Sequence, residues 1–437
     1  MLGHFRAALL VALIAAPPLA AQQPTAARAD SLAQALRALQ ARVDSLTAAL
    51  RSLQAAAPGA PAPAASAGDD LAALRAAAAS AAGTDTIKPD TAPTQFVGRE
   101  RNQNQLNPEI SATGDVRAYA QTSGAQGDNF DPREFEVAFQ SALDPYSHTK
   151  IFVSLENGEV SVEEGYAYWI GLPGHLRFDV GKFRQQFGEL NRWHLHALPE
   201  TEYPLALRAY TGGDGLSAAG ASLYWAAPTG GVAGTHELYA QVTRGNDDTL
   251  FLGSHKAAFL GHVNNFWQLT PSTYAQVGLS ALYGTNPAAI ADTTGRTVGL
   301  KTLLTGLDFR LTWRPPAQAL YHEMDLRGEL FVLRRDTSGV AGARRLGGYV
   351  DLTYKLSQRW IAGVRGDYVE SPAFGDITRA VVPSLTYWES EWVFLRAEFL
   401  HQRGLERDPL GTPFAVNTNR LAFQAVWAIG PHKHEIY

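Results

Sequence analysis

Apolar and polar residues alternate with a period of two through most of this chain. Phe135, Val137 and Phe139, for example, alternate with Glu134 and Glu136. Because successive side chains of a strand point to opposite faces, this period predicts strands with one apolar and one polar face. Gly-, Pro- and Ser-rich breaks divide the pattern into about sixteen runs. Strands are predicted near 109–121, 133–143, 150–157, 162–171, 175–186, 215–226, 235–244, 256–268, 274–284, 297–313, 321–334, 345–355, 360–369, 377–388, 392–402 and 419–429.

The breaks between these runs alternate in length. The mostly short ones are 144–149, 172–174, 227–234, 269–273, 314–320, 356–359 and 389–391. The mostly longer ones are 122–132, 187–214, 245–255, 285–296, 335–344 and 403–418. Short turns on one rim and long loops on the other are typical of an outer-membrane barrel, whereas a soluble sandwich has no reason to sort its loops by length.

Tryptophan residues gather at one end of the predicted strands. Eight of the nine lie near short breaks or near the end of the last strand, and only Trp193 does not. The eight are Trp169, Trp225, Trp267, Trp313, Trp360, Trp388, Trp392 and Trp427. Indole rings collect where hydrocarbon meets headgroups. We therefore predict an all-β fold, a transmembrane antiparallel β-barrel of about sixteen strands over residues 107–437.

The first quarter of the chain follows different patterns. Arg6, an apolar run over 7–16 and small residues at Ala20 and Ala21 predict a signal peptide over 1–21. Apolar residues then repeat at spacings of four and three over 30–54, which predicts a short periplasmic coiled coil, with a lone amphipathic helix as the alternative. The repeat consists of Leu32, Leu36, Leu39, Val43, Leu46, Leu50 and Leu53. Small and polar residues over 55–106 predict a flexible linker.

Composition excludes several classes of protein. The chain has no cysteine, so disulfide scaffolds, thiolate metal sites and cysteine nucleophiles are excluded. A formal charge of −5 over 437 residues argues against a nucleic-acid partner. The signal peptide and the barrel pattern together place the chain in the outer membrane of a Gram-negative-type (diderm) bacterium, in contact with its lipid. A three-stranded coiled coil would suit a trimeric homo-oligomer.

The polar face of the predicted strands carries opposite charges two residues apart. In a barrel this face points into the lumen. The pairs are Asp115 with Arg117, Arg177 with Asp179, Asp308 with Arg310, Asp325 and Glu329 around Arg327, Arg365 with Asp367, and Arg396 with Glu398. Such a ladder either braces the wall with ion pairs or forms a charge ring that sets selectivity.

The longest break, 187–214, is the main candidate for a functional segment. A long loop that folds into a barrel narrows its lumen, whereas one that stays outside is a solvated surface loop. The predicted constriction residues are Lys182, Arg184, Arg192, His194, His196, Glu200, Glu202 and Arg208.

Metal binding and catalysis have weaker support. His194 and His196 are weak candidates for metal ligands, because their spacing from the following glutamates matches no specific signature. Glu163 and Glu164 are adjacent in a strand and are expected on opposite faces. No nucleophile elbow, phosphate loop or zinc-protease motif is found, so we expect neither an enzyme nor a cofactor.

Two segments resemble known porins. Residues 178–188, followed by a long break and Gly212, Gly213, Asp214 and Gly215, resemble the strand-loop-strand segment of phosphate-selective-type (O/P-like) porins. Residues 107–111 and 163–224 resemble a group of outer-membrane proteins labelled zinc-regulated or TonB-dependent. The resemblance implies a passive channel fold.

The sequence therefore predicts a porin-like channel for passive diffusion of small hydrophilic solutes or ions, with 187–214 as the constriction. The alternative is an outer-membrane anchor whose coiled coil binds the cell wall or a periplasmic partner. A barrel enzyme would need a convergent catalytic set that a sequence alone does not reveal.

Overall fold

A computed structural model describes residues 108–430, apart from 123–128, 157, 229–233, 246, 255, 292–296, 338–339 and 408–411. The predicted signal peptide, coiled coil and linker (1–21, 30–54 and 55–106) lie outside the described residues and remain predictions. Within the described part, no helix has the length and apolar character needed to cross a membrane.

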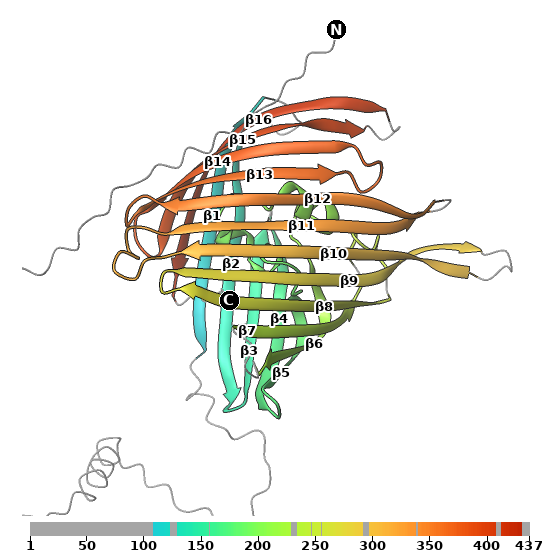
Figure 1. Cartoon of the computed structure of the whole chain (residues 1–437), viewed down its shortest axis with the longest axis horizontal. Coiled ribbons are helices and arrows are strands. Elements are labelled where there is room, and N and C mark those ends of the chain that lie inside the picture. Colours follow the sequence, from blue (N-terminus) through green and yellow to red (C-terminus); the bar gives the residue numbers. More distant parts are fainter. Residues whose placement is uncertain are drawn as a thin grey trace, which may run out of the picture. The chain divides into compact units, whose positions relative to one another are not determined.

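Sixteen antiparallel strands close into one barrel, in which neighbours in sequence are neighbours in the sheet and β1 pairs with β16 (Figure 1). The strands are β1 (Glu109–Gln121), β2 (Asn129–Asp144), β3 (Ser147–Glu156), β4 (Glu159–Leu172), β5 (Leu176–Arg184), β6 (Ser217–Ala227), β7 (Thr235–Arg244), β8 (Ala257–Thr270), β9 (Thr273–Ala291), β10 (Thr297–Trp313), β11 (Met324–Thr337), β12 (Val340–Lys355), β13 (Trp360–Glu370), β14 (Ile377–Trp388), β15 (Val393–Arg407) and β16 (Pro413–Ile429). Each overlaps a predicted strand, so the predicted all-β barrel is confirmed.

The period of two sorts side chains between the outside and the inside of the barrel. On β14, Ile377, Val381 and Leu385 are exposed on the outer face, whereas Ala380 and Val382 are buried on the inner one. The other strands expose Leu, Val, Ile and Phe in the same way. An apolar outer surface of this extent is unfavourable in water and suits lipid hydrocarbon, so we treat the strands as membrane-spanning.

Several strands are longer than the sequence predicted. β9 continues to Ala291, β12 begins at Val340 and β15 continues to Arg407. The predicted bounds of the loops at 285–296, 335–344 and 403–418 are therefore wrong where these strands extend into them. Backbone pairing does not require apolar side chains, so strands can extend beyond the apolar band with Gly, Thr and Asn in them.

The chain between β5 and β6, residues 185–216, runs inside the ring of strands (green in Figure 1). We call it the inner segment. It contains two short 3₁₀ helices, η2 (Leu190–Arg192) and η3 (Leu195–Ala197), and one α-helix, α3 (Leu205–Thr211). Gly212, with φ of 90°, ends α3 in a conformation that favours glycine.

An apolar cluster fixes the inner segment against one part of the wall. Phe187, Leu190, Leu207 and Tyr210 of the segment are buried among inward-facing residues of β8 to β15. The wall contributes Ala258, Leu260, Leu282, Leu304, Phe331, Leu333, Tyr349, Val369, Ala380, Val382 and Leu400. Burial of one such side chain contributes about 1.5–3 kcal/mol, so the cluster makes the segment a fixed part of the barrel.

Candidate functional site

Polar contacts join the inner segment to strands around the whole barrel. Gln185 and Gln186 bond to β7, and Gly188 to β9. Further contacts from the segment reach β2 and β4 (His194), β15 (Thr201) and β13 (Glu200). Because these strands lie on all sides of the barrel, the segment lies within the lumen.

Glu202 is the centre of an arginine cluster. Its carboxylate lies 2.5 Å from Arg208, 3.0 Å from Arg420 on β16 and 3.3 Å from Arg117 on β1. Burial favours the neutral acid, but the charges of Arg208, Arg420 and Arg117 outweigh it and hold the pKa of Glu202 below its usual value. Glu202 is therefore ionised and ties the segment to the seam between β1 and β16.

Glu200 forms a second ionic contact with the wall. Its Oε2 accepts a hydrogen bond from Nη1 of Arg365 on β13 at 2.9 Å, and Nε of Arg365 donates to Asp367 at 3.0 Å. Arg365 also donates to the backbone oxygen of Glu202. Bonds to two carboxylates and one backbone oxygen satisfy the Nε and Nη1 donors of this buried guanidinium, which limits the cost of burying these charges.

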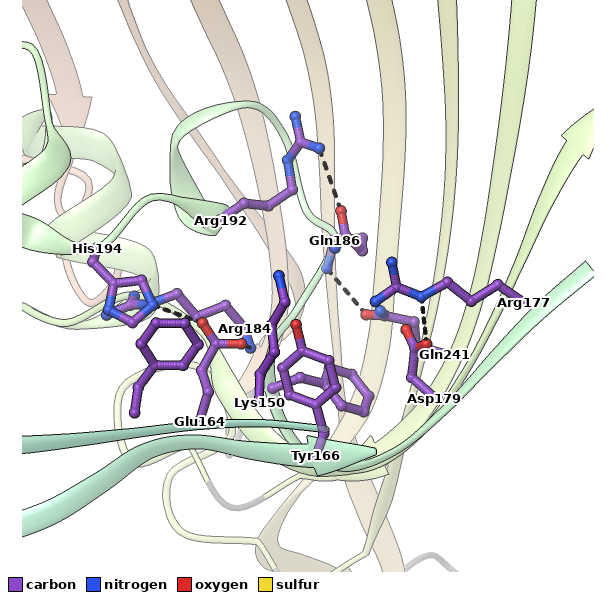
Figure 2. Close-up of a pocket in the computed structure, with 12 residues that line it drawn as sticks. Lys150, Glu164, Tyr166, Arg177, Asp179, Arg184, Gln186, Arg192, His194 and Gln241 are labelled. Carbon is purple, nitrogen blue, oxygen red and sulfur yellow. Dashed lines mark hydrogen bonds and ion pairs between the residues drawn. The ribbon is translucent and has the colours of Figure 1, made fainter. Parts of the chain in front are cut away.

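Two polar cavities adjoin the inner segment. The first, of about 40 Å³, lies toward β3, β4, β5 and β7 (Figure 2). Four of its lining residues are basic: Lys150, Arg177, Arg184 and Arg192. Two carboxylates, Glu164 and Asp179, also line it, and Arg177 pairs with Asp179 at 2.7 Å. The basic lining residues thus outnumber the acidic ones.

The second cavity is larger, about 410 Å³, and lies toward β1 and β2. Arg117, Arg133 and Arg208 line it together with several carboxylates. The carboxylates are Asp131, Glu156, Glu202 and Asp214. Tyr203 also lines the second cavity, and its hydroxyl accepts a hydrogen bond at 3.1 Å from Nη1 of Arg184, which lines the first. Charged side chains of both signs thus follow the inner segment from one cavity toward the other.

His194 stands between carboxylates from two strands. Its Nε2 lies 2.7 Å from Glu164 Oε1, and its Nδ1 lies 2.6 Å from Glu136 Oε2 and 3.2 Å from Glu163 Oε2. Burial lowers the pKa of His194, but the charge of Glu136 and hydrogen bonds to Glu136 and Glu163 outweigh it and raise the pKa well above its usual value. The surroundings therefore favour a cation at this ring. His196 lies beside it, with Nδ1 3.2 Å from Glu134 Oε2.

A β-bulge brings both Glu163 and Glu164 to this ring. The register between β3 and β4 shifts where Phe152 pairs with Glu164 and Val153 pairs with Val162, which leaves Glu163 as an extra residue. The expectation that these two glutamates point to opposite faces is therefore wrong. A bulge inserts one residue into the alternation and lets two consecutive side chains point inward.

The structure brings together seven of the eight predicted constriction residues. Six belong to the inner segment, Arg184 at the end of β5 contacts the segment, and Arg192 pairs with Glu189 at 3.3 Å. The seven are Arg184, Arg192, His194, His196, Glu200, Glu202 and Arg208. Lys182 is apart from them, because its Nζ donates to the backbone oxygen of Val162 and does not line either cavity.

The predicted charge ladder faces the lumen, but only three of its six in-strand pairs form. These are Arg177 with Asp179, Asp325 with Arg327, and Arg365 with Asp367. Most of the others bond to groups on other strands or on the inner segment, because the strand register brings different polar groups closer, whereas neither carboxylate oxygen of Asp308 has a hydrogen-bond partner among the described residues. Asp115 pairs with Arg133, Arg117 with Asp131, Arg310 with Asp325 and Glu189, Arg396 bonds to Thr386 and Gln424, Glu398 to Thr201, and Glu329 to Tyr349.

Glu134 and Glu136 are site residues that the sequence analysis did not single out. Both are buried on the lumen face of β2 beside the two histidines. Their spacing of two on a strand was a signal of a shared face, but two acidic residues on a lumen face are common in barrels. Only the path of the inner segment shows what they meet.

Comparison by sequence gives a partial match. No protein-family model matches the chain. A protein of Aquifex aeolicus (strain VF5) is 29% identical over 137 residues, which covers 30% of this chain and 29% of that relative, so the chain matches less than a third of the relative's length. The comparison does not test the resemblance to phosphate-selective-type or zinc-regulated proteins, which remains a prediction.

Two solved structures are similar to the barrel. An anion-selective porin from Comamonas acidovorans matches with a TM-score of 0.50 at 10% identity, over 74% of this chain and 100% of that chain. The outer membrane channel DcaP of Acinetobacter baumannii matches with a TM-score of 0.50 at 12% identity, over 74% of this chain and 97% of that chain. At these identities the likeness concerns the fold alone. The described residues of this chain have the barrel fold of outer-membrane porins.

Proposed function

We propose that this protein is an outer-membrane, porin-like channel that passes small hydrophilic solutes or ions by passive diffusion. The observation that carries the proposal is a charged segment lying inside a closed barrel with an apolar outer surface. Polar cavities adjoin this segment. Water and solutes find in such a lumen the hydrogen-bonding partners that lipid does not offer.

The inner segment is the proposed constriction. The apolar cluster closes its contact with β8 to β15, so solutes would pass on the side of β1 to β7, where the two cavities lie. Near the narrow first cavity, charges act at low local dielectric and dominate the choice of ion. The excess of basic side chains favours anions at the first cavity, whereas carboxylates compensate the arginines that line the second.

Conductance in planar bilayers tests whether the protein is a channel and whether the inner segment is its constriction. We expect discrete channels from the purified protein, with a reversal potential under a salt gradient that shifts toward cations in Arg192→Gln and toward anions in Glu202→Gln. Excision of residues 190–210 should raise single-channel conductance, because it removes η2, η3 and all of α3 except Thr211 from the lumen. If excision changes neither conductance nor reversal potential, the inner segment is not the constriction. A protein that inserts without conducting would contradict the channel itself.

An anchor function is the second candidate, and the apolar cluster inside the barrel favours it, because a lumen partly filled by packed side chains suits a rigid support. In this function the predicted coiled coil at 30–54 binds the cell wall or a periplasmic partner. Deletion of residues 22–106 separates the two: a channel keeps its conductance, whereas an anchor loses its cell-envelope phenotype. A trimeric state is likewise proposed, and cross-linking of the intact and deleted chains tests whether residues 30–54 set it.

A further inference from the structure

We propose that the lumen contains a binding site for one divalent transition-metal ion of the zinc type, with His194, Glu134, Glu136 and Glu163 as ligands. One ligand atom from each of the four residues lies within 4.8 Å of the others. One imidazole nitrogen and several carboxylate oxygens form a ligand set that suits Zn²⁺ or Mn²⁺. The site adjoins the first cavity, but metal binding is measured without conduction, so the proposal stands or falls independently of the channel function.

The hydrogen bonds of His194 orient it as a ligand. Its Nε2 faces Glu164 Oε1 at 2.7 Å, which places a ring proton on Nε2. Its Nδ1 then faces two carboxylate oxygens, of Glu136 at 2.6 Å and of Glu163 at 3.2 Å. A lone pair facing two carboxylates is repulsive, so Nδ1 holds a proton in the metal-free protein, and a bound metal ion would take the place of that proton. An imidazole whose second nitrogen donates to a carboxylate is the usual arrangement around a bound metal.

The neighbouring carboxylates have the same requirement. The carboxyl groups of Glu134 and Glu163 lie within hydrogen-bonding distance of each other, so they share either a proton or a cation. Glu134 is 1% exposed, and among the described residues its Oε1 has no hydrogen-bond donor. A buried carboxylate oxygen without a donor is costly, and a coordinated cation satisfies it.

The charge balance also leaves room for a cation. Four carboxylates meet here, those of Glu134, Glu136, Glu163 and Glu164. Among the described residues, Arg184 lies 2.8 Å from Glu163, and Lys150 lines the first cavity together with Glu164. The two imidazoles add positive charge only if they hold an extra proton. A divalent ion would compensate most of the remaining negative charge without protonating either ring.

The site is rigid and reachable. Glu134 and Glu136 project from β2, Glu163 from the bulge of β4, and the ring of His194 packs on Phe152 with 4.9 Å between the ring centroids. The side chain of Glu163 is 15% exposed, and His194 and Glu164 line the first cavity, which provides a path for an ion. A bound ion would join the inner segment to β2 and β4.

Zinc binding by the full chain in detergent micelles tests the proposal. His432→Ala and His434→Ala are included in every protein, because these residues could bind the ion on their own. After treatment with a chelator, equilibrium dialysis at neutral pH against Zn²⁺ and elemental analysis give the number of ions per chain. Co²⁺ in place of Zn²⁺ adds d–d absorption bands that report nitrogen and oxygen ligation.

Matched variants locate the ion. His194→Gln and Glu163→Gln alter the site, whereas His262→Gln and Glu398→Gln remove an imidazole and a carboxylate buried elsewhere in the lumen. We expect one Zn²⁺ per chain in the background protein and in both control variants. We expect affinity to fall by about tenfold or more in His194→Gln and Glu163→Gln.

Two results would overturn the proposal. One is a background protein that stays metal-free at about 100 μM Zn²⁺, a concentration at which even weak specific sites are occupied. Protons, and not a metal ion, would then compensate the negative charge of the four glutamates. The other is unchanged affinity in a folded site variant. Heat-modifiable migration of the barrel on gels shows which variants fold, and Glu163→Gln, at the exposed edge of the site, decides the outcome if His194→Gln does not fold.

Discussion

Arg365 on β13 and Glu200 of the inner segment form an ion pair in which Nη1 and Oε2 are 2.9 Å apart and both side chains are almost fully buried. The same guanidinium holds Asp367 at 3.0 Å. This group therefore connects the lumen segment to the wall and compensates two buried carboxylates at once. Its removal would leave both acids without their main partner.

Arg365→Gln is expected to destabilise the barrel by about 3–5 kcal/mol, the usual cost of leaving a buried charge uncompensated. Arg314→Gln is the matched control, because Arg314 is 60% exposed and lies 3.7 Å from Glu323. An exposed pair of this kind contributes about 0–1 kcal/mol. Urea unfolding of the refolded protein in micelles measures both values.

A double variant checks the assignment to this contact. The loss of stability in the double variant Glu200→Gln with Arg365→Gln should be smaller than the sum of the losses in the two single variants. Each single variant leaves one charged partner of the pair uncompensated, whereas the double variant replaces both. Costs that simply add would mean that Glu200 and Arg365 are not coupled and that the segment is held in another way.

The strands could be predicted because membrane barrels impose a period of two on every strand. The pairing of the inward charges could not. Asp115 was predicted to pair with Arg117 in its own strand, but the register of β1 against β2 brings Arg133 to it. The pairing of β1 with β2 shifts by a bulge between Asp115 and Arg117, and the alternation of side chains in one strand does not reveal where a bulge lies.

Part of the candidate site was predictable from the sequence. His194 and Glu200 stood out because the break that contains them is long and charged. The carboxylates around His194 did not, since Glu136 comes from another strand and the bulge at Glu163 reverses the expected direction of one side chain. The only sign of the bulge in the sequence is that two glutamates, Glu163 and Glu164, follow each other in a run that otherwise alternates.

Gly188→Ala is expected to destabilise the barrel by about 2–4 kcal/mol. Gly188 has φ of 63°, and a Cβ there would lie 1.9 Å from Glu329 Oε2. Glu329 is itself held by Leu190 N at 3.0 Å and by the Tyr349 hydroxyl at 2.8 Å, so it cannot move without losing these bonds. Thermal unfolding followed by circular dichroism measures the change.

Gly213→Ala is the matched control for Gly188→Ala. It lies in the same inner segment, but a Cβ at Gly213 would meet no atom within 4 Å. We expect an effect below about 0.5 kcal/mol. Equal losses in the two variants would contradict the tight contact between the start of the inner segment and β11.

Asp247→Asn should stabilise the connection between β7 and β8 at neutral pH. Burial raises the pKa of Asp247 to about 6, although its carboxylate accepts a hydrogen bond from Leu250 N. The folded form thus binds a proton more tightly than the unfolded form, whose value is 3.8, and local stability is lost as pH rises from about 4 to about 6. The neutral amide avoids this loss.

The gain from Asp247→Asn should reach about 1–2 kcal/mol above pH 6 and vanish below about pH 4. Hydrogen exchange at the Leu250 amide, corrected for the intrinsic rate at each pH, measures it. Protection that is equal in the two proteins at neutral pH would show that the carboxylate of Asp247 is fully solvated.

Glu202→Gln is expected to alter both ion preference and stability. The variant leaves Arg117, Arg208 and Arg420 without the carboxylate that they share. The second cavity then becomes more positive, so the reversal potential should shift toward anions. Glu389→Gln removes the same charge from an exposed turn and should not shift it.

The stability effect of Glu202→Gln has a defined dependence on pH. The pKa of Glu202 is raised by burial but lowered more by the three arginines, so the folded form holds a proton less tightly than the unfolded form, whose value is 4.5. The stability that the ionised carboxylate contributes is therefore fully present above about pH 5 and is lost as pH falls below about 4.5. We expect wild type to exceed Glu202→Gln by about 1–3 kcal/mol from pH 8 to pH 5, and the difference to shrink only in more acidic solution. A difference that already declines near pH 6 would show that the three arginines do not hold this carboxylate in its ionised form.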